Sequence, residues 1–410
     1  MIKEYYQVIQ KEQIARIENS ILQRVELNQL NQTTLRMYLN GKVGLAKAEG
    51  AYDDLELEKI AFQRVKEGPE YQAEPTSNQQ IEIVYNYMIA KGSDFVADMS
   101  DFISTLKNLF PAITFSNHIK LVDHIFRLHN NNGVYLSYQD HFLDMNVCFE
   151  YSRAGEKKSG CFRFRGRRYE KEVFISYLSN LLQACQSPYL SKPEQPLPII
   201  ISTQDRVFFT QLLTILNGER YFPDSSSFSA IKEQLLFHPS FSFYQSHDPE
   251  IHFIPFFDAE AVVNPTFRIS LVQEGKVITP YTNKEISQKT GLPLTGSSVP
   301  VWGGMPTLSL QAFDIQSTHQ NLAEVLNGSN GILLQQIHYE DDSTRENLKV
   351  RADHVFLTDG STILGALPPL SVSVPWKNLF SVCFKGVTIE PIIPFSNQFG
   401  LVLDSIPYQW

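Results

Sequence analysis

The amino-acid sequence predicts an α+β protein of two domains, and three observations predict it. The 410 residues suffice for two domains of roughly 100–200 residues each. Strand-like alternation dominates both halves, whereas helical spacing is confined to a few segments. Four prolines fall within residues 187–198, which is typical of a linker. We therefore expect an N-terminal domain (1–190) of antiparallel sheet with helices and a β-rich, barrel- or sandwich-like C-terminal domain (199–410).

The first fifty residues are predicted to form strands. Alternating or β-prone segments occupy residues 6–10, 14–17, 21–27, 33–39 and 42–46. Asn40-Gly41 joins the last two segments and predicts a hairpin, because a type I′ turn requires positive φ at both central residues. From Asp53 the apolar spacing becomes helical, and Gly68-Pro69 marks its end.

The remainder of the first domain alternates between helical and strand-like patterns. Helices are predicted at about 79–91, 98–110 and 170–184. Between the second and third of these, strands are predicted at 112–117, 120–128, 134–139, 146–153 and 161–165. The cluster Asn130-Asn131-Asn132-Gly133 predicts a turn within this set.

The second half begins with a strand at 199–201 and a helix at about 205–217 that ends at Asn217-Gly218. Beyond about residue 240 the pattern is almost entirely strand and turn, with a short helix at about 318–326. Repeated alternation, as in 266–272 and 371–374, favours a closed or sandwiched β domain.

Charge and composition exclude several classes of protein. The net charge is -9, which argues against a generally basic nucleic-acid binder and against a polybasic membrane-surface protein. No apolar run approaches the roughly 18 residues of a membrane span, and the first residues lack the apolar core of a signal peptide. The four cysteines (148, 161, 185 and 383) are too scattered for a CxxC zinc site or a disulfide framework. We expect a cytoplasmic, reducing setting.

Metal-binding patterns are weak. Neither HExxH nor HExxxH occurs. The segment His247-Asp248-Pro249-Glu250-Ile251-His252 places four potential ligands in six residues, but Pro249 favours a solvated turn over a metal site. His247 and His252 are thus weak metal candidates, and His118 and His124 are expected to be ordinary strand histidines.

Patterns for nucleophilic catalysis or nucleic-acid binding are no stronger. G-x-S-x-G is absent, and Ser225-Ser226-Ser227 suits a loop. Cys161 lies beside basic residues, but an unreactive strand cysteine is favoured. The run Arg163-Phe164-Arg165-Gly166-Arg167-Arg168 interleaves aromatic and basic residues as single-strand binders do. The acidity of the chain favours a charged strand end instead.

Several segments, in order, resemble the TldD/PmbA (TldD/TldE) peptidase family. Thr34 to Ala46, followed by Asp53-Asp54 and a helix, resembles the family's opening strand pair and first long helix. The second half adds Asp248-Pro249, Phe256–Val262, Arg268–Gly275, Tyr281, Thr290–Gly296 and Pro306–Leu310. The order and spacing extend over nearly the whole chain.

The resemblance implies that this chain lacks the family's zinc site. The catalytic TldD-type subunit carries HExxxH on the helix after the first strand of its C-terminal domain, and those positions fall on Phe209, Thr210 and Thr214. Phenylalanine has no lone pair to offer, and threonine is a poor zinc ligand and no general base near neutral pH. The family's cysteine ligand has no counterpart between residues 391 and 398, and Cys383 is the nearest. The chain is therefore more similar to TldE/PmbA-type subunits, with no cofactor of its own.

The function that the resemblance implies is that of a non-catalytic subunit in a peptide-processing complex. It would form a hollow dimer, with a zinc-bearing TldD-like subunit or with itself, and admit an extended peptide into an enclosed cleft. Phe256, Phe257, Asp258 and Trp302 are the candidate cleft residues, with core packing as the alternative for the aromatic ones. A divergent metallopeptidase using His247, Asp248, Glu250 and His252, and a DNA gyrase-associated modulator, are the alternative functions.

Overall fold

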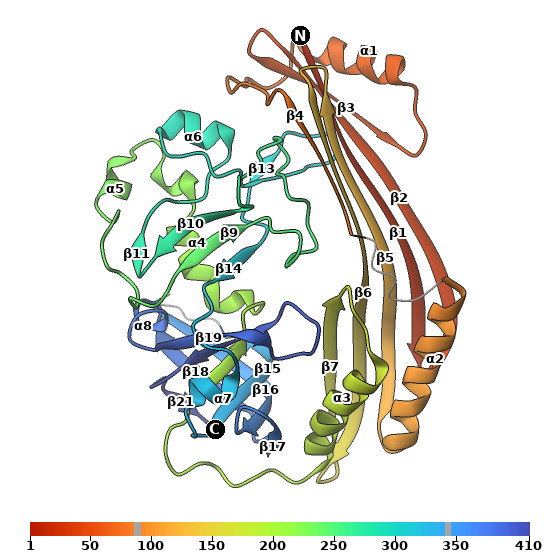
Figure 1. Cartoon of the computed structure of the whole chain (residues 1–410), viewed down its shortest axis with the longest axis vertical. Coiled ribbons are helices and arrows are strands. Elements are labelled where there is room, and N and C mark those ends of the chain that lie inside the picture. The colour runs from red at the N-terminus through yellow and green to blue at the C-terminus, as the bar shows by residue number, and fades with distance from the viewer. Residues whose placement is uncertain (86–91, 341–345) are drawn as a thin grey trace.

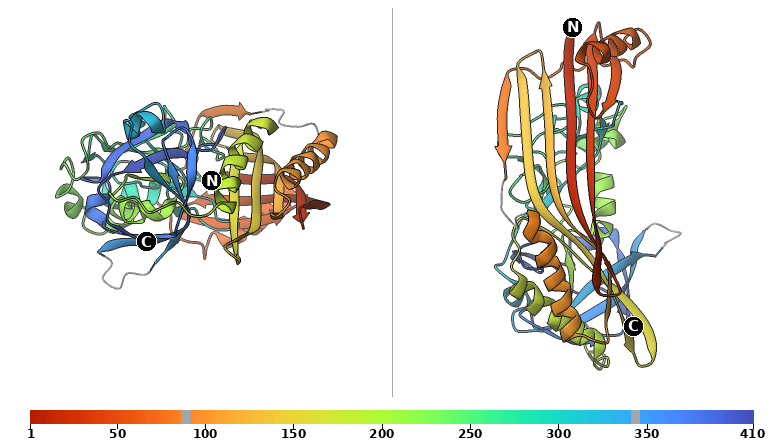
Figure 2. Two further views of the ribbon diagram at one scale, coloured as in Figure 1. Left: turned by 90° about the horizontal axis from the view of Figure 1, so that it is seen from below. Right: turned by 90° about the vertical axis from the view of Figure 1, so that its right-hand side faces the viewer.

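The computed structural model describes residues 1–85, 92–340 and 346–410. A long curved sheet forms one side of the molecule, and a β-rich domain forms the other (Figure 1). The long strands of this sheet extend along most of the molecule, as the right-hand view of Figure 2 shows. The fold is the α+β class that the sequence predicts.

The N-terminal domain contains a seven-stranded sheet in the order β3-β2-β1-β5-β6-β4, with β7 also paired to β6. Its strands are β1 (Ile2–Glu18), β2 (Ile21–Leu39), β3 (Lys42–Glu49), β4 (Gln79–Val84), β5 (Thr114–Asn130), β6 (Val134–Arg153) and β7 (Glu156–Gly166). All neighbours are antiparallel except β4 and β6. The outer side of β6 pairs with β4 over residues 134–139 and with β7 over residues 143–153.

Three helices belong to this domain: α1 (Asp54–Arg64), α2 (Gly92–Leu109) and α3 (Lys171–Gln186). Asp53 caps α1 by accepting hydrogen bonds from the backbone N–H groups of Leu55 and Glu56. The helix packs closely on β3 at Gly44, where an added Cβ would lie 1.9 Å from the carbonyl oxygen of Ala61. α2 and α3 share a hydrophobic core with one face of β5, β6 and β7.

The sequence patterns predicted most of these elements. Asn40 and Gly41 form the predicted hairpin turn, both with positive φ (52° and 73°). The segments 6–10 and 14–17 belong to one continuous strand. The helix expected at 79–91 is wrong, because residues 79–84 form a strand whose alternating side chains pair in parallel with β6. Residues 86–91 lie outside the described part of the chain.

The C-terminal domain follows residues 187–198, which contain no helix or strand. Its main sheet has eight strands: β8 (Ile199–Ser202), β15 (Gly331–Tyr339), β16 (Asn347–Thr358), β17 (Ile363–Leu367), β18 (Leu370–Pro375), β19 (Phe384–Pro391), β20 (Phe399–Leu403) and β21 (Tyr408–Gln409). A second sheet consists of β9 (Phe243–Ser246), β10 (Arg268–Gln273), β11 (Lys276–Val277) and β14 (Phe313–Ile315). β12 (Ser298–Val299) and β13 (Thr307–Leu308) form a separate pair.

Short helices connect the strands of this domain. They are η1 (Arg206–Phe209), α4 (Thr210–Ile215), η2 (Gly218–Tyr221), α5 (Ser226–Ser229), α6 (Lys284–Thr290), α7 (Leu322–Leu326) and α8 (Trp376–Leu379). The eight-stranded and four-stranded sheets contribute to one hydrophobic core, so the domain is layered in the manner of a sandwich. None of the described helices combines the length and apolar character needed to cross a membrane.

Candidate functional site

A cleft runs along the junction of the two domains. It consists of three neighbouring hollows of about 640, 480 and 320 Å³, of which the first two are lined by both domains and the third by the C-terminal domain. Phe253 and Asn397 line both the first and the second hollow, and Ile251 and Phe399 line both the first and the third. Because adjacent hollows share walls, we treat them as one feature, the interdomain cleft.

The register of β5, β6 and β7 builds the sheet wall of the interdomain cleft. One row across the three strands is His118, Asn146 and Arg163, and the neighbouring row is Lys120, Asp144 and Arg165. All six line the second hollow. The residues between them in sequence, such as Ile119, Met145 and Phe164, are buried and belong to the hydrophobic core that the sheet shares with α2 and α3. Strand alternation thus separates a polar cleft wall from a hydrophobic core.

Most charges on this wall are compensated. Lys120 pairs with Glu12 at 3.0 Å, and Arg165 pairs with Asp144. Burial, Lys120 and Arg16 lower the pKa of His118, which favours the neutral imidazole. Arg163 is exposed and forms no ion pair with another described residue. It therefore provides the uncompensated positive charge of the wall.

Asp205, between β8 and η1, lines the same hollow. Burial raises its pKa to about 6, against the opposing effects of the Ser202 N–H and of Arg163. The carboxylate accepts a hydrogen bond from the Ser202 N–H at 3.1 Å. The second hollow thus contains a cation and a carboxyl group that titrates near neutrality.

The opposite wall holds His252, one of the two histidines considered as metal candidates, whereas His247 lines none of the three hollows. His252 Nε2 lies 2.9 Å from Asp314 Oδ1, and Arg268 contacts the other oxygen of Asp314 at 2.8 Å. Although burial opposes it, His252 and Arg268 hold the pKa of Asp314 at about 2. His247 is fully enclosed, its Nδ1 has no hydrogen-bond partner, and burial lowers its pKa to about 4.

These side chains do not converge into a ligand set. The Asp248 carboxylate accepts the Glu250 N–H at 3.0 Å, and the Glu250 side chain is exposed. Among the residues that the structure describes, no group of three or more His, Cys, Asp or Glu side chains could hold a metal ion.

The positions aligned with the family's zinc motif differ in environment. Phe209 is fully buried, and its ring packs against those of Phe313 and Phe380 at centroid distances of 4.8 and 5.2 Å. Thr210 and Thr214 are exposed, and their hydroxyls donate to the helix carbonyls of Val207 and Thr210 at 3.1 and 2.9 Å. The three side chains neither point into one space nor supply zinc ligands.

The residues proposed to contact peptide lie elsewhere. Phe256 and Phe257 are fully buried in a core with Tyr6 and strand residues of β5 and β6. Asp258 is buried and accepts hydrogen bonds from the backbone N–H groups of Glu260 and Val262. These three side chains therefore do not line the interdomain cleft, and core packing describes the two phenylalanines.

Trp302 is 39% exposed and lies outside the hollows of the interdomain cleft. Lys47 of β3 stands over its ring, with Nζ 4.2 Å from the centroid. The neighbouring Gly303 N–H donates to Thr34 Oγ1 at 3.0 Å. Trp302 thus belongs to a contact between the domains at the far end of the sheet.

Two buried polar groups that join the domains were not singled out from the sequence. Arg167 binds Asp140 and also donates to the carbonyl oxygens of Glu250 and His252 at 2.8 and 3.0 Å. In the second group, Tyr71 donates to Glu260 at 2.8 Å. Burial, followed by the Asp258 carboxylate, raises the pKa of Glu260 to about 7. The basic run that contains Arg167 was a signal of the first group in the sequence. The second group had no comparable signal.

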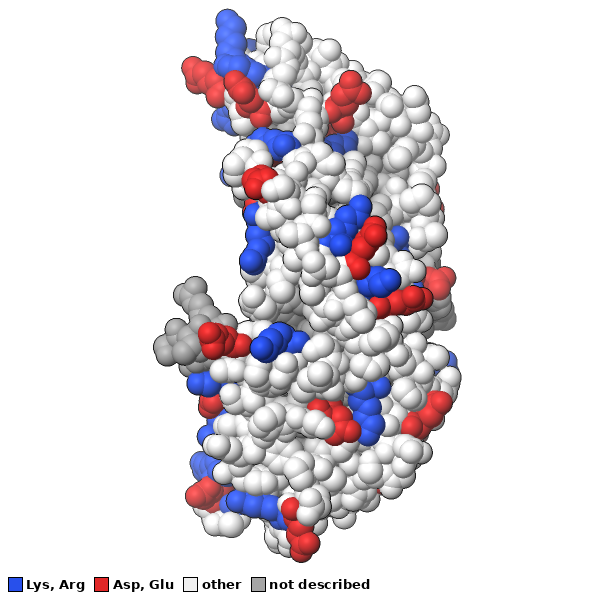
Figure 3. Space-filling view, turned by 90° about the vertical axis from the view of Figure 1, so that its left-hand side faces the viewer, with Lys and Arg blue, Asp and Glu red and all other residues white. Residues whose placement is uncertain are grey.

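The basic run is largely neutralised. Arg165, Arg167 and Arg168 pair with Asp144, Asp140 and Glu170, respectively. On the face shown in Figure 3, acidic and basic side chains are interspersed. The alternative of a charged strand end accounts for this run without nucleic acid.

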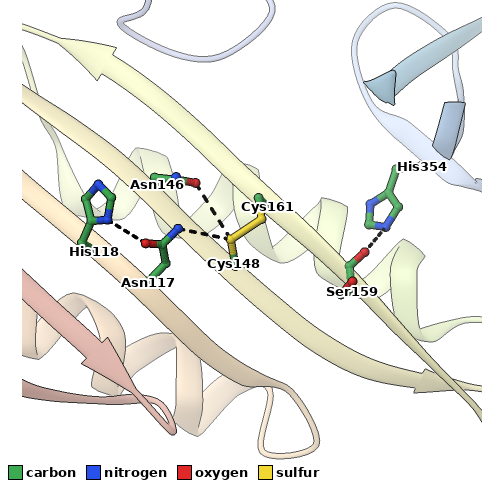
Figure 4. The surroundings of a disulfide bond; sticks show 7 residues. All are labelled: Asn117, His118, Asn146, Cys148, Ser159, Cys161 and His354. Carbon is green, nitrogen blue, oxygen red and sulfur yellow. Dashed lines mark hydrogen bonds between the residues drawn. A yellow bond between two sulfur atoms is a disulfide. The ribbon is translucent and has the colours of Figure 1, made fainter. Parts of the chain in front are cut away.

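Cys148 and Cys161 are joined by a disulfide bond (Figure 4), although the spacing of the four cysteines was expected to be too scattered for a disulfide framework. They are 13 residues apart, but the hairpin of β6 and β7 places them directly opposite each other. Cys185 and Cys383 are free and buried.

The fold and this cleft define the class of protein: an elongated N-terminal sheet faces a layered β domain across a polar cleft. Residues 198–383 match the family model described as the PmbA/TldA metallopeptidase C-terminal domain. This part of the chain therefore matches the TldD/PmbA family that the sequence motifs indicated. No curated protein shows significant sequence similarity to the chain.

Solved structures with the same fold extend the comparison to the whole chain. TldE from Thermococcus kodakarensis superposes with a TM-score of 0.82 at 14% identity, covering 100% of this chain and 97% of that one. A proposed modulator of a DNA gyrase from Thermotoga maritima gives 0.76 at 12% identity, covering 100% and 96%. Another from Bacteroides thetaiotaomicron gives 0.72 at 11% identity, covering 100% and 94%. These likenesses establish the fold.

Proposed function

We propose that this chain is a TldE/PmbA-like, non-catalytic subunit of a TldD/TldE-type peptide-processing metalloprotease complex. In this proposal the chain binds an extended peptide in the interdomain cleft, and a TldD-like partner supplies the zinc that cleaves it. The complex is a dimer in the cytoplasm. This chain contributes substrate binding and no metal.

The observation that carries the proposal is the environment of Phe209. A zinc ligand must present a lone pair to an open coordination site. The side chain at this position is instead packed within an aromatic core, and the hydroxyls of Thr210 and Thr214 are hydrogen-bonded to backbone carbonyls. Recruiting zinc here would require both new side chains and a rearranged core.

The shape and lining of the interdomain cleft support peptide binding. An extended peptide advances about 3.3 Å per residue and offers main-chain donors and acceptors on both edges. The cleft supplies amide side chains from both domains, namely Asn146, Gln204, Asn397 and Gln398. Arg163 adds a cation at the surface of the same hollow. Amide groups suit main-chain recognition, which makes little demand on peptide sequence.

The proposal is tested by metal analysis and by reconstitution. The purified chain should contain no stoichiometric zinc after dialysis, should bind a fluorescent unstructured peptide and should not cleave it. Cleavage should appear when a TldD-type homologue carrying HExxxH is added, and the two proteins should co-purify. Tightly bound zinc together with peptidase activity in the isolated chain would support the divergent metallopeptidase that uses His247 and His252.

The names of two similar structures favour a second candidate, a gyrase-associated modulator. Filter binding of DNA at two salt concentrations tests direct nucleic-acid contact, because phosphate contacts produce a steep salt dependence. We expect weak binding that is unchanged when Arg163, Arg165 and Arg168 are replaced together and the structural residue Arg167 is retained. Strong, salt-sensitive binding that this variant loses would favour the modulator.

A further inference from the structure

The disulfide between Cys148 and Cys161 crosses two paired strands. The two residues are direct partners in the β6–β7 ladder, with Cα atoms 3.9 Å apart. The ladder extends over eleven residue pairs, from Leu143–Gly166 to Arg153–Glu156. The pairing of the two strands is therefore sufficient to hold the two positions opposite each other without the disulfide.

The sulfur atoms lie in polar, accessible surroundings. Both cysteines are only partly buried. Asn117 Nδ2 donates to Cys148 Sγ at 3.5 Å, and Asn146 Oδ1 lies 3.9 Å from the same sulfur (Figure 4). The next pair on the same face of the ladder, Asn146 and Arg163, lines the second hollow of the interdomain cleft. The bond is thus in the cleft wall, immediately beyond the hollow.

This location favours thiol–disulfide exchange. Exchange proceeds by thiolate attack on a sulfur and is faster when the departing thiolate is stabilised. Arg163 is two residues from Cys161 on the same face of β7, and it forms no ion pair with another described residue. A nearby cation lowers the pKa of a thiol and so stabilises its thiolate.

The two free cysteines have the opposite character. Cys185 is 1% exposed, and burial raises its pKa to about 12. Burial likewise raises the pKa of Cys383. These thiols are expected to be unreactive, so they provide internal controls at two other sites of the same chain.

We propose that Cys148 and Cys161 form a reversible thiol–disulfide site whose reactant is a dithiol that enters the interdomain cleft. One thiolate of the dithiol attacks a Cys sulfur, the protein S–S bond breaks, and the released Cys thiolate takes up a proton. The second thiol of the reactant then attacks the reactant's first sulfur, which is bonded to the protein in the mixed disulfide. This attack releases the other cysteine. Two electrons and two protons pass to the protein, and the reactant leaves as a cyclic disulfide.

Reversibility follows from the strand pairing. After reduction, the β6–β7 ladder keeps the two thiols opposite each other. The reverse reaction with a cyclic disulfide therefore needs no conformational change to bring them together. Disulfides in reducing compartments are usually transient and redox-sensing. The proposal is independent of peptide binding and of any partner subunit.

The test uses the folded full-length protein and dithiothreitol as the dithiol. The protein is incubated without denaturant, pulsed with iodoacetamide and mapped by mass spectrometry. Before reduction, Cys148 and Cys161 should be found in one linked peptide. After reduction both should be alkylated at least about 100-fold faster than Cys185, with the far-ultraviolet circular dichroism unchanged. Oxidised dithiothreitol should restore the link.

Two outcomes overturn the proposal: reduction that occurs only in denaturant, together with labelling of Cys185, or free thiols at both positions in air-oxidised protein. Cys148→Ser separates accessibility from bond formation, because Cys161 should then be labelled rapidly without any reductant. Slow labelling of Cys161 in this folded variant also overturns the proposal. Cys383→Ser is the matched control and should leave the labelling of both cysteines unchanged.

Discussion

Arg167 and Asp140 form a buried, two-point ion pair at the centre of the domain junction. The Arg167 Nε and a terminal nitrogen each lie 2.7 Å from a different oxygen of Asp140, whose side chain is fully buried. The same guanidinium donates to two carbonyl oxygens of the C-terminal domain and stands over the Phe253 ring at 4.6 Å. The side chain of Arg167, the residue that follows β7, thus holds the two walls of the interdomain cleft together.

Replacing Arg167 by alanine should therefore destabilise the protein strongly. The change leaves Asp140 as an uncompensated buried charge, which costs about 3–5 kcal/mol. Urea unfolding measures the loss. Arg168→Ala is the matched control, since Arg168 is exposed and its pair with Glu170 should contribute about 1 kcal/mol or less. Equal losses in the two variants would show that Arg167 is not a structural link.

His354 should make stability depend on acid pH. It is buried between the domains, its Nε2 lies 3.0 Å from the Ser159 carbonyl oxygen, and burial lowers its pKa to about 4. The unfolded state, with an ordinary pKa of about 6.5, binds more protons below neutrality, so stability is lost as the pH falls between these values. At about pH 5 the loss from this group is about 2 kcal/mol.

His354→Gln removes the titration and retains a donor for Ser159. Its free energy of unfolding should fall less than that of the wild type between pH 7 and pH 5. Chemical denaturation at a series of pH values measures the difference. His338→Gln serves as the control because His338 is exposed. Parallel curves for His354→Gln and the wild type would contradict the assignment.

The sequence predicted the secondary structure of a segment correctly where a single local pattern determines it. The Asn40-Gly41 turn and the helical spacing after Asp53 each specify a conformation by themselves. Residues 79–84 were misassigned because six alternating residues are too few to separate a strand from a short helical face. The pairing partner β6 decides the outcome, and it lies about fifty residues away.

The candidate site was harder to predict from the sequence than the fold was. The row His118, Asn146 and Arg163 exists only because three strands adopt a particular register. The pair Cys148 and Cys161 depends on the same register. Phe256 and Phe257 are apolar, and an apolar residue suits a core as well as a peptide-binding wall, so the sequence alone left both alternatives open.

Phe209 should prove to be a core residue. Phe209→Ala should cost about 3–5 kcal/mol, because it leaves a cavity among Phe243, Phe313 and Phe380. Thr210→Ala, one residue away on the exposed surface, should change stability by about 0.5 kcal/mol or less. Thermal and urea unfolding compare the two variants. A small effect at Phe209 would mean that this position is open, as a ligand position must be.

Arg163 should influence which peptides the interdomain cleft accepts. It is the exposed cation of the sheet wall, and the neighbouring Arg165 is already paired with Asp144. Arg163→Glu reverses the charge and should weaken binding of an acidic unstructured peptide about tenfold or more, corresponding to about 1.4 kcal/mol. An uncharged peptide of equal length should be affected less, and added salt should reduce the difference because it screens exposed charges.

Arg351→Glu provides the matched control for that charge reversal. Arg351 is exposed on β16 and lies outside the hollows of the interdomain cleft. Fluorescence anisotropy with both peptides tests separately whether the chain binds peptide and whether the peptide binds at the sheet wall. If neither peptide binds the wild type, peptide binding itself fails. If both bind and the Arg163 and Arg351 variants behave alike, binding is independent of the sheet wall, and the peptide must lie elsewhere on the molecule.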